Sequence, residues 1–335
     1  MGLSAGGRAL KKHIGTAFAP GHLTAFFRTA ATPEDPLHRG SLGGGICLSL
    51  GATTRIQVSD RKKPSDPNGP DDPANSPSLA IRITINDQER EAAVSRSALT
   101  MFLHDVVKNG WLTRDQLSGM EFSVSTTLEL PEQSGWGMSG AGALSSVLAL
   151  REALNIPYSF HETIAFAHLS ELEHSTGLGD VAAQCAGGIE IRKRPGIQPY
   201  GSIDSIPCEP LVIVCLTIPD PLSTAGVLSD KVLVESLNTS GRVAMDGISH
   251  LPTLDMFLEL SRKFTLKTGI ADLRILHILE QMRKMGIGEG GMAMLGNSIY
   301  AVGDTAALVE LFESYGRVDV CGIDHGGARV IASAP

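Results

Sequence analysis

Pro131-Glu-Gln-Ser-Gly-Trp-Gly-Met-Ser-Gly-Ala-Gly-Ala-Leu-Ser-Ser146 is the stretch of this chain that decides its fold. Small residues dominate it, an alternating strand pattern precedes it, and an apolar helix pattern follows it directly. A strand, a glycine-rich turn and a helix N-terminus in this order form an anion site. The reason is that the unpaired N–H groups of the first helical turn and the helix dipole both attract negative charge.

This stretch differs from two common phosphate loops. No Lys-Ser or Lys-Thr follows its last glycine, as a Walker A loop requires, and its spacing is not the Gly-x-Gly-x-x-Gly of dinucleotide sites. We interpret it as the phosphate loop of a small-molecule kinase. The alternative, a flexible linker, fits poorly with the strand and helix patterns on either side.

The composition is that of a globular protein with about two domains. The chain has 335 residues, of which 42% are hydrophobic and 19% charged. The net charge is −8 and there is no strong basic cluster, so we expect no nucleic-acid partner. No apolar run approaches the length of a membrane span, so we expect no membrane partner either.

The cysteines and the N-terminal residues predict a cytoplasmic protein. Five cysteines without paired spacing fit reduced thiols better than a disulfide framework or a zinc site. Residues 1–12 lack the apolar core of a signal peptide.

Periodicity places the elements of the first half. Alternation predicts strands at 81–85 and 122–130, and Gly43-Gly44-Gly45 leads into another. We expect helices at 95–109, from the phosphate loop to about 155, and from the Ser-x-x-Glu capping box at 159 to about 174. Segment 16–27 is interpreted as a strand, a turn at Pro20-Gly21 and a second apolar run. Segment 59–78 is rich in Pro, Asp, Asn, Ser and Lys, and is assigned to a mobile loop.

The second half mixes helices with short strands. We expect helices at 253–267 and 273–285 and strands at 211–218, 299–302, 318–323 and 329–332, an α+β pattern. The proline-rich segment 195–210 is the best domain boundary. It predicts an N-terminal lobe over 14–200, which holds the phosphate loop, and a C-terminal lobe over 201–335.

Three separated motifs resemble those of the GHMP kinases, which include galactokinase, homoserine kinase and mevalonate kinase. The family motif Pro-x-x-x-Gly-Leu-Gly-Ser-Ser-Ala matches Pro131, Gly135, Gly137, Ser139 and Ala141, with departures at Trp136, Met138 and Gly140. An aspartate motif matches Gly177-Leu-Gly-Asp180 followed by Gly187-Gly188, and a glycine-rich motif matches 286–296 more loosely.

Other segments point to a subgroup. Residues 20–27 replace the Pro-Gly-Arg or Pro-Gly-Lys opening of sugar and mevalonate kinases. Together with 176–181, 192–196 and the closing Gly326-Gly-Ala-Arg-Val330, they are most similar to the archaeal pantoate kinases. The resemblance covers nearly the whole chain from Phe18 onward, with 59–78 as a local insertion.

The resemblance implies a two-lobed α+β fold, with an N-terminal lobe like ribosomal protein S5 domain 2 and a ferredoxin-like C-terminal lobe. It implies ATP-dependent phosphorylation of (R)-pantoate to 4-phosphopantoate, an early step toward coenzyme A, with ATP and Mg²⁺ as cofactors in a homodimer. Two rivals stay open. One is a kinase of another alcohol, such as mevalonate or homoserine, and the other is a catalytically silent nucleotide-binding protein on the same fold.

Asp180 is the expected catalytic base, because a carboxylate can orient an acceptor hydroxyl and take its proton. The alternative is a helix N-cap aspartate. Glu171 and the Ser139 hydroxyl are the expected Mg²⁺ ligands, since this ion prefers oxygen. Glu173 is a rival, about 200° further round the same helix. Ser139 is also a candidate cap of its helix.

The remaining site residues follow from the loop and the family. The phosphate cradle is predicted to comprise Pro131, Ser134, Gly135, Trp136, Gly137, Met138, Ser139, Gly140, Ala141 and Gly142. Trp136 fits an adenine contact, a loop anchor or core packing equally well. His22, Thr24, Gly290 and Gly291 are expected to face the acceptor, with a structural histidine and a plain turn as the alternatives.

Arg192 and Arg194 are candidates to clamp a substrate carboxylate, because the guanidinium fork matches its geometry. Alternate residues of a strand share a face, so both arginines are expected to point inward or neither. Two surface arginines are the alternative.

Overall fold

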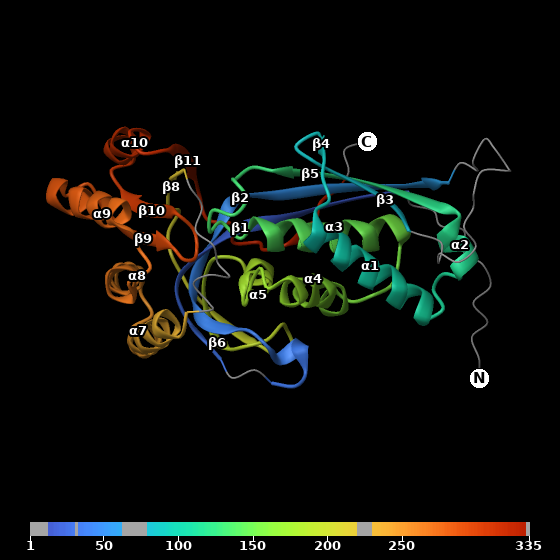
Figure 1. Cartoon of the computed structure of the whole chain (residues 1–335), viewed down its shortest axis with the longest axis horizontal. Helices are drawn as coiled ribbons and strands as arrows, with labels where there is room; N and C mark the ends of the chain where they lie inside the picture. The colour runs from blue at the N-terminus through green and yellow to red at the C-terminus, as the bar shows by residue number, and fades with distance from the viewer. Residues whose placement is uncertain (1–12, 31–32, 62–78, 220–229, 333–335) are drawn as a thin grey trace.

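The computed structural model describes residues 13–30, 33–61, 79–219 and 230–332. These residues form two lobes, each with its own sheet (Figure 1). The larger sheet has the order β12-β1-β2-β5-β3-β4, with β6 paired to β2 and β7 to β6, and the smaller has the order β11-β8-β10-β9. The strands of the larger sheet are β1 (Ile14–Thr29), β2 (Ser41–Asp60), β3 (Ala80–Ile85), β4 (Gln88–Glu89), β5 (Met120–Leu128), β6 (Ile189–Arg194), β7 (Ser202–Ile206) and β12 (Arg329–Val330). The predicted two-lobed α+β fold is confirmed.

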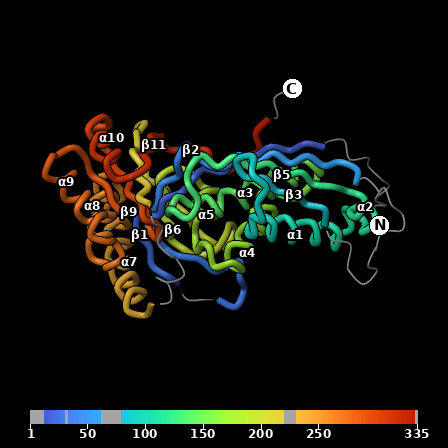
Figure 2. Tube along the Cα trace, turned by 45° about the horizontal axis from the view of Figure 1, so that its top comes forward, coloured from blue at the N-terminus to red at the C-terminus, as the bar shows by residue number. Residues whose placement is uncertain are grey.

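Strands β1 and β2 connect the two lobes of the molecule. They pair antiparallel along almost their whole length and run from the larger lobe to the C-terminal lobe (Figure 2). The expected turn at Pro20-Gly21 is wrong, because β1 continues through it with only a register shift between these two residues. A bulge accommodates Pro20, which has no N–H to donate to a ladder.

Helices cover one face of the larger sheet (Figure 1). They are α1 (Ala93–Lys108), α3 (Met138–Leu154), α4 (Phe160–His174) and α5 (Asp180–Ala186), with the short α2 (Arg114–Ser118) at the far end. Most residues of α3 are buried, as its apolar circumference predicts. The predicted capping box of α4 is confirmed, since Ser159 and Glu162 bond each other's backbone N–H.

The C-terminal lobe packs α8 (Leu254–Thr268), α9 (Leu273–Met285) and α10 (Thr305–Glu313) against the smaller sheet, and α7 (Lys231–His250) against α8 and β1. That sheet contains β8 (Ile213–Thr217), β9 (Gly288–Ala293), β10 (Ser298–Gly303) and β11 (Arg317–Cys321). The helices expected near 253–267 and 273–285 are confirmed, whereas α7 and α10 were not predicted.

The lobes are not simple consecutive segments. Strands β7 and β12 belong to the larger sheet although both lie beyond residue 200. Membership of the larger sheet therefore does not follow the predicted boundary at residue 200. The division of the chain into two folding units, 14–200 and 201–335, stays a prediction. Most of the predicted mobile loop, residues 62–78, lies outside the described residues. Within the described ranges, no helix has the length and apolar character needed to cross a membrane.

Candidate active site

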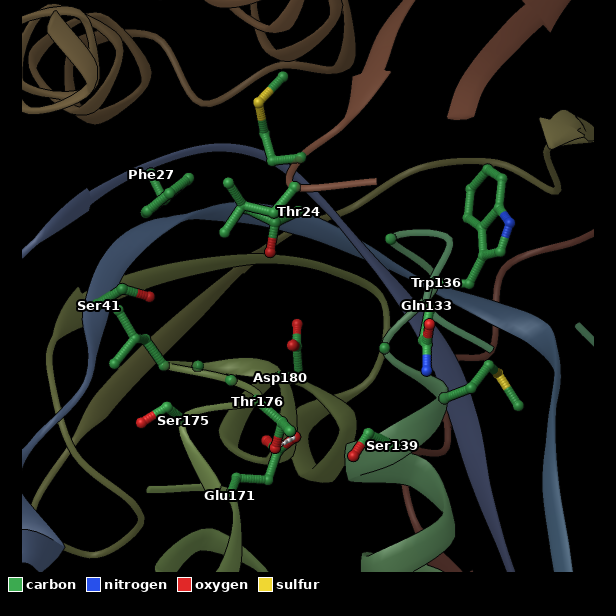
Figure 3. Close-up of a pocket in the computed structure, with 18 of the residues that line it drawn as sticks. Thr24, Phe27, Ser41, Gln133, Trp136, Ser139, Glu171, Ser175, Thr176 and Asp180 are labelled. Atoms are coloured by element: carbon green, nitrogen blue, oxygen red, sulfur yellow. Dashed lines mark hydrogen bonds between the residues drawn. The ribbon is translucent and has the colours of Figure 1, made fainter. Parts of the chain in front are cut away.

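A cavity of about 460 Å³ lies where the two lobes meet (Figure 3). Its walls come from β1, the 133–139 loop with the start of α3, the segment from α4 to α5, and the turn after β9. The backbone N–H of Met294 in that turn donates to Thr24 O on β1 at 2.9 Å. A small-molecule site commonly has this volume.

The start of α3 forms a wall of the cavity with an uncapped helix N-terminus. Gly137 is the N-cap residue with φ 63°, a left-handed conformation that favours glycine, and no side chain caps the helix. The Ala141 N–H bonds Gly137 O at 3.0 Å, which leaves the N–H groups before it for a ligand. Gln184 Nε2 donates to the same Gly137 carbonyl at 2.8 Å and fixes the loop. The alternative of Ser139 as a cap is thus wrong.

Half of the predicted cradle lies off the cavity wall. Pro131, Ser134, Gly140, Ala141 and Gly142 do not line it, whereas Gly135, Trp136, Gly137, Met138 and Ser139 do. Gly140 serves helix packing, because a Cβ there would lie 3.1 Å from Glu171 Oε2 on α4. The buried Trp136 indole donates to Thr217 Oγ1 on β8 at 2.8 Å, so its ring anchors the loop to the smaller sheet.

Asp180 opens α5 and points its carboxylate into the cavity (Figure 3). Its side chain is 24% exposed, and Oδ1 accepts a hydrogen bond from His22 Nδ1 at 2.7 Å. The N-cap position belongs to Gly179, so the alternative of Asp180 as an N-cap aspartate is wrong. An uncapped helix start and a carboxylate therefore face the same space.

Glu171 lies on the same wall and is buried (Figure 3). Burial, and then the negative charge of Asp180, raise the pKa of Glu171 to about 8. Thr176 Oγ1 donates to Glu171 Oε1 at 3.4 Å, and within the described part of the chain no ion pair reaches Glu171. The rival Glu173 is exposed and accepts from Ser97 Oγ on α1 at 2.5 Å.

A buried carboxylate with no cationic side chain beside it suits a metal cation. No group of three or more His, Cys, Asp and Glu side chains that could hold a metal occurs in the described residues. Magnesium often takes only one or two ligands from protein and the rest from phosphates and water. Glu171 and the Ser139 hydroxyl, which both line the cavity, therefore fit such an ion.

His22 is not where the sequence placed it. Its side chain is fully buried and is not part of the cavity wall, so the expected contact with the acceptor is corrected to a contact with Asp180. On its other side, Nε2 lies 3.1 Å from Oε1 of the buried Glu190. Burial alone would lower the pKa of His22, but the hydrogen bonds and charges of both carboxylates outweigh it and raise the pKa above 6.5.

Arg192 and Arg194 lie in different environments. Arg192 is buried and pairs with Glu190, whereas Arg194 is exposed and donates from Nε to Tyr200 O at 2.6 Å. The expectation that both share a face is wrong because the β6–β7 ladder has a register shift between them. Neither lines the cavity.

Gly290 and Gly291 lie inside β9, opposite Ala301 and Tyr300 of β10, and are also absent from the cavity wall. Their expected role at the acceptor is corrected to a strand position. The predicted Thr24 does line the cavity. Sequence reasoning missed several lining residues: Phe27, Ser41, Gln133, Leu178 and Met294. All except Ser41 lie within the quoted motifs, which marked the segments but not these side chains.

Comparison with known proteins defines the class. Residues 102–188, which include the loop, Glu171 and Asp180, match the family described as the GHMP kinases N terminal domain. A curated pantoate kinase from Methanospirillum hungatei is 31% identical over 319 residues, which cover 94% of this chain and 96% of that protein. The chain therefore belongs to the GHMP kinase family.

Further relatives share this range. A pantoate kinase from Methanocaldococcus jannaschii is 28% identical, covering 91% of this chain and 99% of that protein. A solved structure described as a phosphotransferase related to the CoA biosynthesis pathway has 26% identity and a TM-score of 0.78, and the match covers 95% of this chain and 98% of that one. A homoserine kinase from Cytophaga hutchinsonii, with 14% identity and a TM-score of 0.64, shares the fold, over 96% of this chain and 98% of that one.

Proposed function

We propose that this protein transfers the γ-phosphoryl group of ATP to the 4-hydroxyl of (R)-pantoate, giving 4-phosphopantoate and ADP. The observation that carries the proposal is the meeting of the uncapped α3 N-terminus and the Asp180 carboxylate in one cavity. The similarity to pantoate kinases over more than nine tenths of the chain supports the choice of acceptor.

Asp180 is the proposed base. His22 occupies Oδ1, which leaves Oδ2 to meet the acceptor hydroxyl. As the hydroxyl oxygen bonds to the γ-phosphorus, the bond to the β–γ bridging oxygen breaks and the hydroxyl proton passes to Oδ2. The N–H groups at the start of α3 stabilise the charge on the transferred group, because they already point at it before the reaction. Ser139 and Glu171 would hold a magnesium ion, which when bound would supply positive charge to the phosphates.

Arg192 is the proposed partner of the substrate carboxylate. Its Nε and Nη2 are buried without a hydrogen-bond partner within the described residues. Gly179, which lines the cavity, adjoins this side chain, since a Cβ at Gly179 would lie 2.8 Å from Arg192 Nε. A guanidinium this close to the wall can satisfy its free donors with a carboxylate.

The test is a coupled ADP-release assay with (R)-pantoate, mevalonate and homoserine, each with and without Mg²⁺. We expect Mg²⁺-dependent ADP release with pantoate and little with the other alcohols. Preference for another alcohol would show that pantoate is not the acceptor. ATP binding without transfer to any of the alcohols would favour a catalytically silent nucleotide-binding protein.

The Arg192→Gln variant tests the carboxylate contact. A hydrogen bond between charged groups is worth about 1.5–3 kcal/mol, so the KM for pantoate should rise by about 10- to 100-fold while the KM for ATP changes little. An unchanged KM for pantoate would remove Arg192 from the acceptor site.

The homodimer and the cytoplasmic location belong to the same proposal. The homodimer is suggested by the family resemblance and the cytoplasmic location by the unpaired cysteines, which are all free thiols. Light scattering during size-exclusion chromatography measures the first, and cell fractionation measures the second.

A further inference from the structure

A chain of four buried or half-buried charged side chains runs inward from the cavity. Asp180 at the wall bonds His22 at 2.7 Å, His22 bonds Glu190 at 3.1 Å, and Glu190 pairs with Arg192. His22, Glu190 and Arg192 are each at most 3% exposed as side chains. The proposed mechanism uses Asp180 directly and leaves the role of His22 and Glu190 open.

The number of protons shared by these four side chains determines the charge of His22. Both ring nitrogens face carboxylate oxygens, and an ionised carboxylate only accepts. A neutral imidazole has one N–H, so one nitrogen lone pair would then face a carboxylate lone pair. Either His22 carries two protons or one carboxyl group is neutral. Arg192 beside Glu190 favours the ionised form of Glu190, and Asp180 is 24% exposed at the cavity, where water can solvate its charge. We therefore assign the additional proton to His22.

The resulting order of charges is negative, positive, negative, positive from Asp180 to Arg192, so the chain is neutral as a whole. This order matters because an unpaired buried charge costs several kcal/mol. The titratable groups around His22 from the packed elements are Asp180 on α5, Glu190 and Arg192 on β6, Cys47 on β2 and, beyond Asp180, Glu171 on α4. Burial raises the pKa of Cys47 well above 9.0, so its thiol adds no charge.

The glycine run of β2 makes room for this chain. Gly45 lies next to the bond between His22 and Glu190, and a Cβ there would be 2.2 Å from His22 Nε2 and 2.7 Å from Glu190 Oε1. Any side chain at position 45 would therefore separate the two groups. The Gly43-Gly44-Gly45 run, which no phosphate contact explains, thus has a physical reason at its last residue.

His22 also connects the base to the phosphate loop. Its backbone N–H donates to Trp136 O at 2.9 Å, one residue before the Gly137 N-cap of α3. One residue of β1 therefore holds both the loop and the Asp180 carboxylate, and it fixes the distance between them.

We propose that His22, held as a cation by Glu190, is a positioning residue that aims Asp180 at the acceptor hydroxyl. The cation stabilises the charge on Asp180 and holds Oδ1, so that Oδ2 faces the cavity. Glu190 acts through His22, and Arg192 balances Glu190. This inference rests on the proposed function for the role of Asp180, but the charge of His22 does not depend on it.

The charge is tested first, on the wild-type protein without substrate. We expect ¹⁵N NMR at pH 7, where a free histidine is mostly neutral, to find both ring nitrogens of His22 protonated. The signal is assigned by its loss in His22→Gln. In Glu190→Gln the doubly protonated signal should weaken at the same pH. A neutral His22 in the wild type would overturn the proposal, whatever the enzyme phosphorylates.

The positioning role is tested by kinetics. His22→Gln should lower kcat by about 10- to 100-fold, as loss of a partner that orients a functional side chain does, with the KM values for both substrates nearly unchanged. Glu190→Gln should shift the alkaline limb of the kcat–pH profile to lower pH. Asp204→Asn, which removes an exposed ion pair with Lys193 from the neighbouring strand, is the matched control and should change neither.

Two kinetic outcomes would contradict the role. A folded His22→Gln protein with wild-type kcat would overturn it, and so would a rise in the KM for pantoate with kcat intact, since that result assigns His22 to the substrate. If His22→Gln does not fold, Glu190→Gln and its pH profile decide. If the wild-type enzyme phosphorylates another alcohol but not pantoate, only the proposed acceptor is wrong. The kinetic test of His22 can then be made with that alcohol.

Discussion

The two sides of the cavity are built in different ways. On one side, residues 135–139 present backbone N–H groups from one short, continuous segment. On the other, Asp180 and Glu171 arrive from α5 and α4, and behind Asp180 lie His22 from β1 and Glu190 from β6. The first side depends on local backbone conformation, whereas the second depends on how distant elements pack. Damage to each side should therefore appear in a different kinetic constant.

The largest expected effect is on the carboxylate side. Asp180→Asn should lower kcat by about 10²- to 10⁴-fold, because the amide cannot take the hydroxyl proton. Nucleotide affinity, measured by fluorescence titration or calorimetry, should stay close to the wild-type value. Glu173→Gln, an exposed neighbour on α4, is the control. Near-normal turnover in Asp180→Asn would remove the assignment of the base.

A smaller effect is expected on the backbone side. Gly137→Ala places a side chain in a left-handed conformation and 3.0 Å from His22 O and Gln184 Nε2. A cost of about 1–2 kcal/mol should raise the KM for ATP by about tenfold. Gly110→Ala is the matched control, since Gly110 has φ 75° but nothing within 4 Å of its Cβ position. Equal KM values for ATP in both variants would show that residue 137 does not hold the phosphate.

The contact between loop and smaller sheet should affect stability more than turnover. Thr217→Val removes the acceptor of the Trp136 indole N–H at nearly constant volume. The free energy of unfolding, measured by urea titration, should fall by about 1 kcal/mol with kcat almost unchanged. Thr217→Ser keeps a hydroxyl and should lose less. A large loss of kcat in Thr217→Val would instead make the loop anchor part of the catalytic geometry.

The smallest effect is a pH dependence that belongs to the carboxylate side. The pKa of His22 is raised in the folded protein, so its stabilisation is fully present below the unfolded value of 6.5 and is lost as pH rises through the folded value. The difference in unfolding free energy between wild type and His22→Gln should therefore shrink from pH 6 to pH 9. A difference that grows with pH would mean that His22 is neutral in the folded protein.

The outcome of the sequence predictions follows the same division. Helices α1, α3, α4, α8 and α9 were predicted because an apolar period is a local signal, and α4 also has the capping box at Ser159. The loop and Asp180 were found from contiguous motifs. The errors arose where pairing between distant strands sets the local structure. Pro20-Gly21 forms a bulge because β2 pairs across it, and a register shift between β6 and β7 separates Arg192 from Arg194.

Contiguous residues thus determined the family, the proposed phosphate loop and the carboxylate at position 180, because phosphate recognition uses backbone groups that neighbouring residues arrange. The contact of His22 with that carboxylate, the contact of Glu190 with His22 and the absence of Gly290 and Gly291 from the cavity wall came from the tertiary structure alone. Strand pairing and packing bring residues 22 and 190 together, and no local pattern encodes a contact across 168 positions.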